Sequence, residues 1–171
     1  LCLVRQKQYS ITEIVKEKGG ELPLLLVLDQ IQDPGNLGTI VRTAEGAGVT
    51  GIVMSQDCVD MYNPKVVRST MGAAYRVPFC YVEDLAEEVM KMKEAGICTY
   101  AAQLEGKNSY DEEDYRKASA FLIGNEGNGL RDEVADQAQV YIRIPMKGQV
   151  ESLNAAVATA ILTFEAARQR R

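Results

Sequence analysis

The first residues that could take part in chemistry are Asn36 and Arg42, which follow the apolar run "LLLVLD". That run has the composition of a buried strand and ends in a Pro-Gly turn, after which Asn36 is a favourable N-cap for a helix. Arg42 comes four residues after Gly38, and because helical side chains lean toward the N-terminus, its guanidinium can reach over the bare glycine into the loop. A guanidinium at the mouth of a helix suits a phosphate. A surface arginine paired with Glu45 or Asp33 fits the spacing equally well.

A second loop, "GNEGNGL", follows another apolar run and holds glycines at positions 124, 127 and 129. These spacings match neither a Walker loop nor a dinucleotide loop, and the strand expected at 141–144 is followed by "PMKG" with no acid, so a phosphate cradle is not supported. The glycines alone could simply supply positive φ angles in a turn. Glu126 between asparagines, however, calls for a polar partner at this strand end.

A third loop, "IPMKGQVESLN" over residues 144–154, contains a proline and a glycine before the last helix. Either Ser152 or Asn154 could cap that helix. By itself the loop is adequately explained as an ordinary connection with a cap.

The elements that must position these loops alternate between apolar runs and amphipathic segments. Such alternation predicts βαβ units and an α/β fold with a parallel sheet covered on both faces. In such sheets ligands bind where strands end and helices begin. We expect strands at 24–29, 51–54, 77–82, 97–101, 120–124 and 141–144, helices at 36–46, 84–95, 130–137 and 152–168, and a surface loop with a short helix over 103–117.

Composition excludes several function classes. The chain has 171 residues, of which 46% are hydrophobic and 25% charged, as is usual for a soluble domain, and we expect a cytoplasmic protein without a membrane partner. It has no histidine, and its four cysteines lie far apart, which argues against a metal site and against Cys-His or Ser-His catalysis. Free thiols in a reducing compartment are the favoured interpretation of the cysteines.

The net charge of −5 would by itself disfavour a nucleic-acid partner. That argument weakens if basic residues gather on one face, and Lys65, Arg68 and Arg76 lie near one another in the sequence. The basic residues that end the chain are adequately explained as a solvated helix end.

The chain begins at Leu1 within the apolar stretch "LCLV", and residues 1–20 are mostly polar after it. We therefore expect two parts: a connector over 1–20 that follows a missing N-terminal region, and an α/β domain over 21–171.

Together the three loops resemble the SpoU (TrmH-like) family of RNA ribose 2′-O-methyltransferases, in the SPOUT superfamily. The resemblance covers about residues 22–168 and includes "VVRSTMGAAYRVP", in which Thr70 stands where a serine is common. Three motifs in the right order are far more specific than any one of them. The matching residues are Asn36, Gly38 and Arg42 in the first loop; Gly124, Glu126, Gly127, Gly129 and Leu130 in the second; and Ile144, Pro145, Met146, Gly148, Ser152, Leu153 and Asn154 in the third.

The resemblance implies a parallel-sheet domain with a C-terminal trefoil knot, which connection rules alone would not suggest. It implies S-adenosylmethionine as the methyl donor and an RNA substrate, with ribosomal RNA favoured over transfer RNA. It also implies a homodimer, for which the alanines of the last helix would allow close packing, and it makes residues 1–20 the remnant of an RNA-binding domain and its linker. The cofactor-binding residues it implies are Gly124, Gly127, Gly129, Ile144, Met146, Gly148 and Leu153.

Methyl transfer to a ribose hydroxyl requires alignment of donor and acceptor and removal of a proton. Within this family arginine is the proposed base, but a guanidinium hardly deprotonates in proteins. We therefore expect Arg42 to act as an electrostatic clamp on an RNA phosphate, while Asn36, Glu126, Ser152 and Asn154 orient Arg42 and the ribose. Two alternatives remain open: a non-catalytic module that binds RNA or the cofactor, and a nucleotide- or NAD-dependent enzyme, which the loop spacings disfavour.

Overall fold

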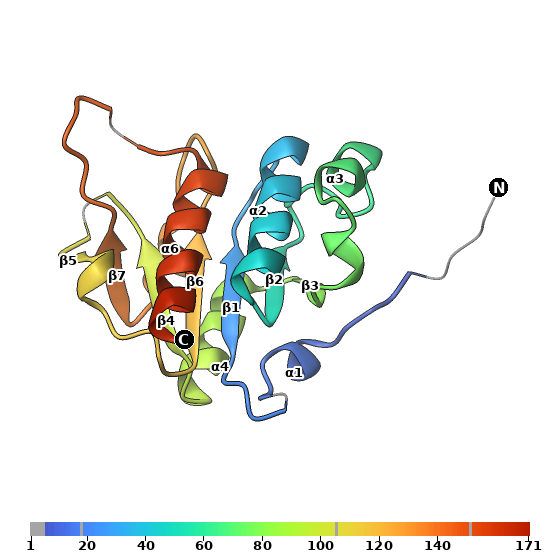
Figure 1. Cartoon of the computed structure of the whole chain (residues 1–171), viewed down its shortest axis with the longest axis horizontal. Helices are drawn as coiled ribbons and strands as arrows, with labels where there is room; N and C mark the ends of the chain where they lie inside the picture. Colours follow the sequence, from blue (N-terminus) through green and yellow to red (C-terminus); the bar gives the residue numbers. More distant parts are fainter. Residues whose placement is uncertain (1–5, 18, 105, 151) are drawn as a thin grey trace.

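The computed structural model describes residues 6–17, 19–104, 106–150 and 152–171. Its centre is a seven-stranded sheet in the order β3-β2-β1-β6-β4-β7-β5, in which every strand pair is parallel (Figure 1). The expected parallel α/β sheet is therefore confirmed. Its strands are β1 Leu24–Leu28, β2 Gly51–Ser55, β3 Phe79–Val82, β4 Cys98–Ala102, β5 Asn108–Ser109, β6 Ser119–Ile123 and β7 Val140–Arg143.

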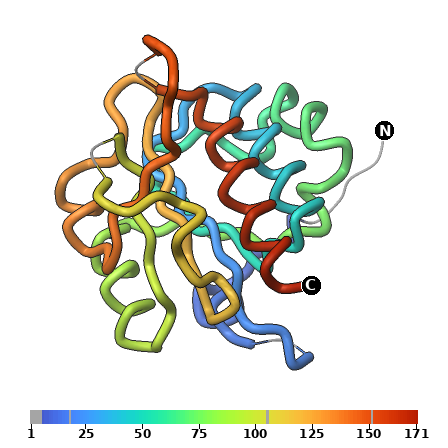
Figure 2. The backbone as a smooth tube through the Cα atoms, turned by 60° about the vertical axis from the view of Figure 1, so that its left-hand side comes forward, coloured from blue at the N-terminus to red at the C-terminus, as the bar shows by residue number. Residues whose placement is uncertain are grey.

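Helices cover both faces of this sheet. On one face lie α2, Pro34–Ala47, and α6, Ala155–Gln169, which pack side by side (Figures 1 and 2). On the other face lie α4, Leu85–Glu94, α5, Asp132–Ala135, and α1, Ile11–Ile14.

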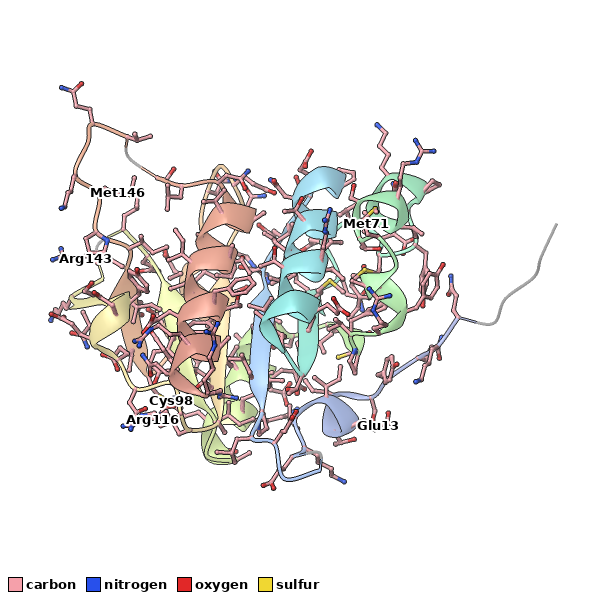
Figure 3. The ribbon with its side chains drawn as sticks, in the orientation of Figure 1. Glu13, Met71, Cys98, Arg116, Arg143 and Met146 are labelled. Carbon is pink, nitrogen blue, oxygen red and sulfur yellow. The ribbon has the colours of Figure 1, made fainter. Side chains whose placement is uncertain are left out.

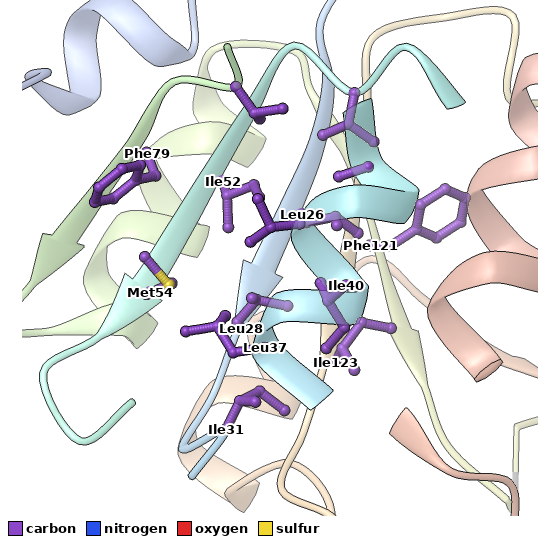
Figure 4. Close-up of a cluster of buried hydrophobic side chains, with 14 of the residues drawn as sticks. Leu26, Leu28, Ile31, Leu37, Ile40, Ile52, Met54, Phe79, Phe121 and Ile123 are labelled. Atoms are coloured by element: carbon purple, nitrogen blue, oxygen red, sulfur yellow. The ribbon is translucent and has the colours of Figure 1, made fainter. Parts of the chain in front are cut away.

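The central strand β1 shows why both faces must be covered. Its residues alternate between the faces, as strand geometry requires, yet all five are buried. Leu26 and Leu28 belong to the cluster that packs under α2 (Figure 4), whereas Leu25 and Val27 belong to the cluster under α4 and α5.

Several short elements were not expected from the sequence. They are α1 in the connector, α3 at Pro64–Ser69, the 3-10 helix η1 at Ala73–Tyr75, and β5 within the expected loop, whereas the 3-10 helix η2 at Tyr110–Glu112 agrees with the short helix expected over 103–117. All are too short for a clear periodic signal. The connector is not detached, because the Ile14 side chain of α1 is fully buried against the domain.

Some expected helix boundaries were wrong. Asn36 is not the N-cap of α2: Asp33 is, because Pro34 suits the first helical position and the Asp33 carboxylate accepts the Asn36 N–H at 2.8 Å. The helix expected over 130–137 shrinks to the four residues of α5. The last helix begins only after Asn154, whose side chain caps it.

Candidate functional site

Three loops meet where the parallel strands end, because β1 and β6 are neighbours and both point toward the same edge of the sheet. At this edge Asn36 Nδ2 donates to Glu126 Oε1 at 2.7 Å, and Asn154 Nδ2 donates to Asn36 Oδ1 at 2.9 Å. Residues separated by 90 and 118 positions in the sequence thus form one hydrogen-bonded chain, which we call the amide–carboxylate chain.

Two of its members are held by the helices that carry them. Asn36 lies in the first turn of α2, which fixes its position relative to β1. The Asn154 Oδ1 accepts the backbone N–H groups of Ala156 and Val157 and thereby caps α6, while its Nδ2 is left to reach Asn36. One asparagine therefore couples the start of the last helix to the site.

The backbone of the second loop folds back on itself. Asn125 and Gly129 form an antiparallel bridge with two hydrogen bonds of 2.9 Å, and Gly129 has a φ of 74°. A Cβ atom on Gly124 would lie 2.1 Å from the Gly129 carbonyl carbon, so only glycine fits there. This close approach of the loop to itself places Glu126 at its tip.

Asn125 was not among the expected site residues, although it holds the loop in shape. Its Oδ1 accepts the N–H groups of Gly127 and Asn128, and its Nδ2 donates to the Gln30 carbonyl at 2.8 Å. Its place beside Glu126 between glycines, where Asn side chains commonly bond to the backbone, was the available signal.

A buried ion pair anchors the base of the same loop and was also missed. The Asp29 carboxylate is fully buried at the end of β1 and accepts the Arg131 backbone N–H at 3.0 Å; its Oδ1 lies 2.8 Å from the Arg131 guanidinium. This hydrogen bonding raises the pKa of Arg131 further above its usual value. Because Arg131 follows Leu130 directly, the pair ties the end of the second loop to β1.

A cavity with a volume of about 500 Å³ lies beside this loop. Both the second and third loops line it, together with apolar side chains of β6, β7 and α6. Its lining contains the carboxylates of Glu126 and Asp132, and no lysine or arginine is among the described lining residues. The cavity is therefore acidic and partly apolar.

The structure places most expected cofactor-binding residues in the lining of this cavity. These are Gly124, Gly127, Gly129, Ile144, Met146 and Leu153, and the expected catalytic residues Glu126 and Ser152 join them. Gly148 is not part of the lining. Asn36 and Asn154 lie outside the lining but reach it through Glu126.

Arg42 stands apart from this group. It is exposed, and within the described residues it forms no ion pair, because Glu45 pairs instead with Arg76 at 2.8 Å. Among the described residues, no hydrogen bond joins Arg42 to the amide–carboxylate chain. Helical spacing sets Arg42 about 120° around α2 from Asn36, so the two residues face different neighbours.

None of the described cysteines is among the residues that line this cavity. Cys58, Cys80 and Cys98 are free thiols, and Cys2 lies outside the described residues. Burial raises the pKa of the Cys80 thiol to about 11, so it is protonated at neutral pH. The described residues contain no cluster of potential metal ligands and no helix long and apolar enough to cross a membrane.

The fold and its cavity define a parallel α/β domain with a ligand site at the carboxyl edge, and comparison with known proteins gives the family. A model of the SpoU rRNA Methylase family matches residues 23–164. The chain therefore belongs to the SpoU rRNA methylase family.

Individual relatives agree with this assignment. The chain is 38% identical to the 23S rRNA (guanosine-2′-O-)-methyltransferase RlmB of Xylella fastidiosa, over 96% of this chain and 66% of that protein. It superposes on the SpoU methyltransferase AviRb of Streptomyces viridochromogenes in complex with AdoMet with a TM-score of 0.87, at 31% identity, over 96% of this chain and 66% of the other. For the AdoMet-bound rRNA methyltransferase of Sinorhizobium meliloti the TM-score is 0.86 at 36% identity, covering 95% and 61%. The chain thus spans slightly less than two thirds of the length of these relatives.

Proposed function

We propose that this chain is the methyltransferase domain of an enzyme that uses S-adenosylmethionine to methylate a ribose 2′-hydroxyl of ribosomal RNA. The observation that carries the proposal is the acidic cavity at the carboxyl edge, joined by hydrogen bonds to Asn36 and Asn154. The names of the relatives, which include a 23S rRNA 2′-O-methyltransferase and AdoMet-bound structures, support the same reaction.

The chemistry of the cavity suits this cofactor better than a nucleoside phosphate. S-adenosylmethionine carries a sulfonium and an ammonium group, so the carboxylates of Glu126 and Asp132 favour it electrostatically. The phosphates of NAD or ATP would instead meet two negative groups. The volume of about 500 Å³ also suits a ligand of nucleoside size.

The glycine loop gives the ligand access to backbone groups. A Cβ on Gly129 would meet no heavy atom within 4 Å, so the space beside this residue is open. Apolar side chains such as Ile144 and Leu153 line the same cavity and offer a surface for an adenine ring. When bound, S-adenosylmethionine supplies an electrophilic methyl group for transfer to an oxygen atom.

The residues of this chain then have distinct tasks. Asn36 holds Glu126 through its Oε1, while Oε2 forms no hydrogen bond within the described residues and is available to accept one from a ribose hydroxyl. Arg42, exposed and without an ion-pair partner among those residues, binds an RNA phosphate and stabilises negative charge on the ribose oxygen. The proton of that hydroxyl passes to Glu126 Oε2 as the methyl group is transferred, and S-adenosylhomocysteine is released. Ser152 lines the cavity close to the capping Asn154 and orients the ribose.

The rest of the enzyme is proposed on the same basis. Residues 1–20 would be the end of an RNA-binding domain and its linker, and the C-terminal part would form the trefoil knot of the family. A role on ribosomal RNA would place the protein in the cytoplasm.

We also propose that the protein is a homodimer. Val157 and Phe164 of α6 are apolar yet 48% and 47% exposed, and their spacing of seven places them on one stripe of the helix, which runs beside α2. Ala155 and Ala156, expected to permit close packing between subunits, are buried within the chain itself. Velocity sedimentation tests this: a Phe164→Asp variant should sediment as a monomer, and a wild-type monomer would contradict the dimer.

The decisive experiment measures ligand preference and reaction together. Calorimetry should show binding of S-adenosylhomocysteine and none of NAD or ATP. Incubation with tritiated S-adenosylmethionine and unmodified ribosomal RNA should give alkali-resistant labelled dinucleotides, as a 2′-O-methyl group requires. Binding of NAD alone would overturn the proposal, and labelling of transfer RNA but not ribosomal RNA would reassign the substrate.

A further inference from the structure

A second cavity, of about 260 Å³, lies on the other side of α2 and α3 from the acidic cavity. Aromatic rings from three segments form it: Tyr9 of the connector, Tyr62 before α3, and Tyr75 and Phe79 after it. The rings of Tyr62 and Phe79 are 5.8 Å apart and tilted, and Lys7 Nζ lies 4.8 Å from the centre of the Tyr9 ring. We call this the aromatic cavity.

One of these rings is unusually accessible. Tyr75 is 61% exposed although it lines the cavity, so one face of its ring is open to a ligand. Met71, four residues earlier, is 69% exposed and is labelled in Figure 3 beside α3. Two large apolar groups so exposed on one short connection are typical of a binding surface.

Basic side chains surround these apolar groups. Lys65 and Arg68 of α3 are exposed, as is Arg76 directly after Tyr75. Of the acidic neighbours, Glu45 already pairs with Arg76. Asp60 accepts the Tyr62 N–H at 3.0 Å. In a chain with a net charge of −5, this concentration of positive charge is local. We call Lys65, Arg68, Met71, Tyr75 and Arg76, with the aromatic cavity, the α3–η1 surface.

This surface is continuous with Arg42. Gly38, Arg42 and Glu45 follow one another at helical spacing on a single face of α2. That face is turned to α3 and η1, because a Cβ on Gly38 would lie 2.3 Å from Ser69 Cβ, and Glu45 pairs with Arg76. Arg42 therefore lies on the face of α2 that is turned to the α3–η1 surface.

We propose that the α3–η1 surface binds a single-stranded segment of RNA next to the nucleotide that is methylated, with a base stacked on Tyr75 and phosphates held by Lys65 and Arg68. Exposed aromatic rings among lysine and arginine are the combination that proteins use for unpaired nucleotides, because every base has a face to stack and every linkage a charge to neutralise. The inference rests on the proposed function. It specifies where the RNA on either side of the methylated nucleotide would lie on this domain.

The test compares matched variants in their affinity for a short fluorescein-labelled single-stranded RNA, followed by anisotropy. Tyr75→Ala should weaken binding about tenfold, the usual loss for one stacked base, whereas Tyr75→Phe should retain it because the ring remains. Lys65→Ala combined with Arg68→Ala should lower the slope of log affinity against log salt by about 1.4, since each phosphate contact to a single strand contributes about 0.7.

The controls remove the same residue types from a distant site. Lys117→Ala combined with Arg116→Ala should leave affinity and salt slope unchanged; Figure 3 shows Arg116 at the opposite end of the molecule from Met71. Affinity for S-adenosylhomocysteine should be unaltered in every variant, which shows that the domain is folded.

Three results would overturn the inference. If wild-type protein binds RNA and Tyr75→Ala and the Lys65/Arg68 variant bind equally well, the surface is wrong while the proposed function stands. If those variants instead change the sedimentation of the protein and not its RNA affinity, the surface is a contact between subunits. If wild-type protein binds S-adenosylhomocysteine but neither binds nor methylates RNA, both the surface and the proposed function fail.

Discussion

The acidic cavity and the α3–η1 surface lie on opposite sides of α2 and are built by different means. The first combines the backbone of the glycine loop with apolar side chains and two acidic residues, and Gly124 and Gly129 shape the loop around Glu126. Side chains dominate the second, where exposed aromatic and basic groups project from short helices. The difference shows how one domain could bind both a cationic ligand, S-adenosylmethionine, and a polyanion, RNA. Acidic residues would attract the first, and basic residues on a separate face would attract the second.

The largest expected effect comes from Arg42, on the face of α2 that is turned to the α3–η1 surface. Arg42→Ala should lower the methylation rate by about a hundredfold to a thousandfold, the usual cost of removing a preorganised group that stabilises developing charge. Affinity for S-adenosylhomocysteine should stay within about twofold, because Arg42 does not line the acidic cavity. Single-turnover kinetics with tritiated cofactor measures the first quantity and calorimetry the second. An active Arg42→Ala protein would remove Arg42 from the reaction, and Arg116→Ala is the matched control.

A change at Gly124 should break the acidic cavity alone. In Gly124→Ala the new methyl group collides with the Gly129 backbone, so the loop must open and the affinity for S-adenosylhomocysteine should fall by about tenfold or more. RNA binding measured by anisotropy should persist, since the α3–η1 surface is distant. In the control Gly46→Ala, where the nearest atom is an ordinary 3.9 Å away, neither affinity should change. Equal losses of both ligands would show that the two regions are not separate.

The buried pair under the loop should affect stability. Asp29→Asn removes the buried charged partner of the Arg131 guanidinium and leaves it only the exposed Glu133. We expect the free energy of unfolding to fall by about 2 kcal/mol, less than for a fully buried pair because Arg131 is partly exposed. Urea denaturation followed by circular dichroism measures this. Asp114→Asn, which breaks an exposed pair with Arg116, should leave the midpoint unchanged. If Asp114→Asn lowered the urea midpoint as much as Asp29→Asn, burial of the carboxylate would not explain the stability that the Asp29–Arg131 pair contributes.

The smallest effect is expected at the cap of α6. Asn154→Ala removes the hydrogen bonds to Ala156 and Val157 and should cost about 1 kcal/mol of stability. It also frees Asn36, so the methylation rate should fall while RNA affinity remains. Asn154→Ser, which keeps a capping oxygen but cannot reach Asn36 in the same way, separates the two roles. Full activity in both variants would mean that the amide–carboxylate chain has no role in the reaction.

Much of the fold was predictable because its signals are local. The run at 24–28 is apolar throughout, which identifies a strand buried on both faces, and all six expected strands are present. Helix starts were less predictable: Asn36 and Asp33 are both good caps, and only the position of Pro34 in the folded helix decides between them. The short elements α3 and η1 gave no periodic signal, yet they carry the α3–η1 surface.

The candidate site also contains residues that the sequence predicted and residues that it did not. Asn36, Glu126 and Asn154 were identified through their motifs, and the structure joins them by hydrogen bonds, although their roles in catalysis remain predictions. Asp29 and Arg131 were missed because they pair with each other across 102 positions of the sequence. Asn125 was missed although its bonds to the backbone of its own loop are local, and only its bond to the Gln30 carbonyl is long-range.

By itself the sequence determined the parallel α/β class, the three loops and the residue types available for chemistry, since buried strands, turns and caps depend on neighbouring residues. It also showed that this chain offers no histidine for catalysis. Only the tertiary structure decided that Asn36, Glu126 and Asn154 meet at one edge of the sheet, and that Lys65, Arg68 and Arg76 gather away from the acidic cavity. The physical reason is that strand order and helix packing set which side chains meet, and the pairing of β1 with β6 across 95 residues is a long-range contact that no local pattern encodes.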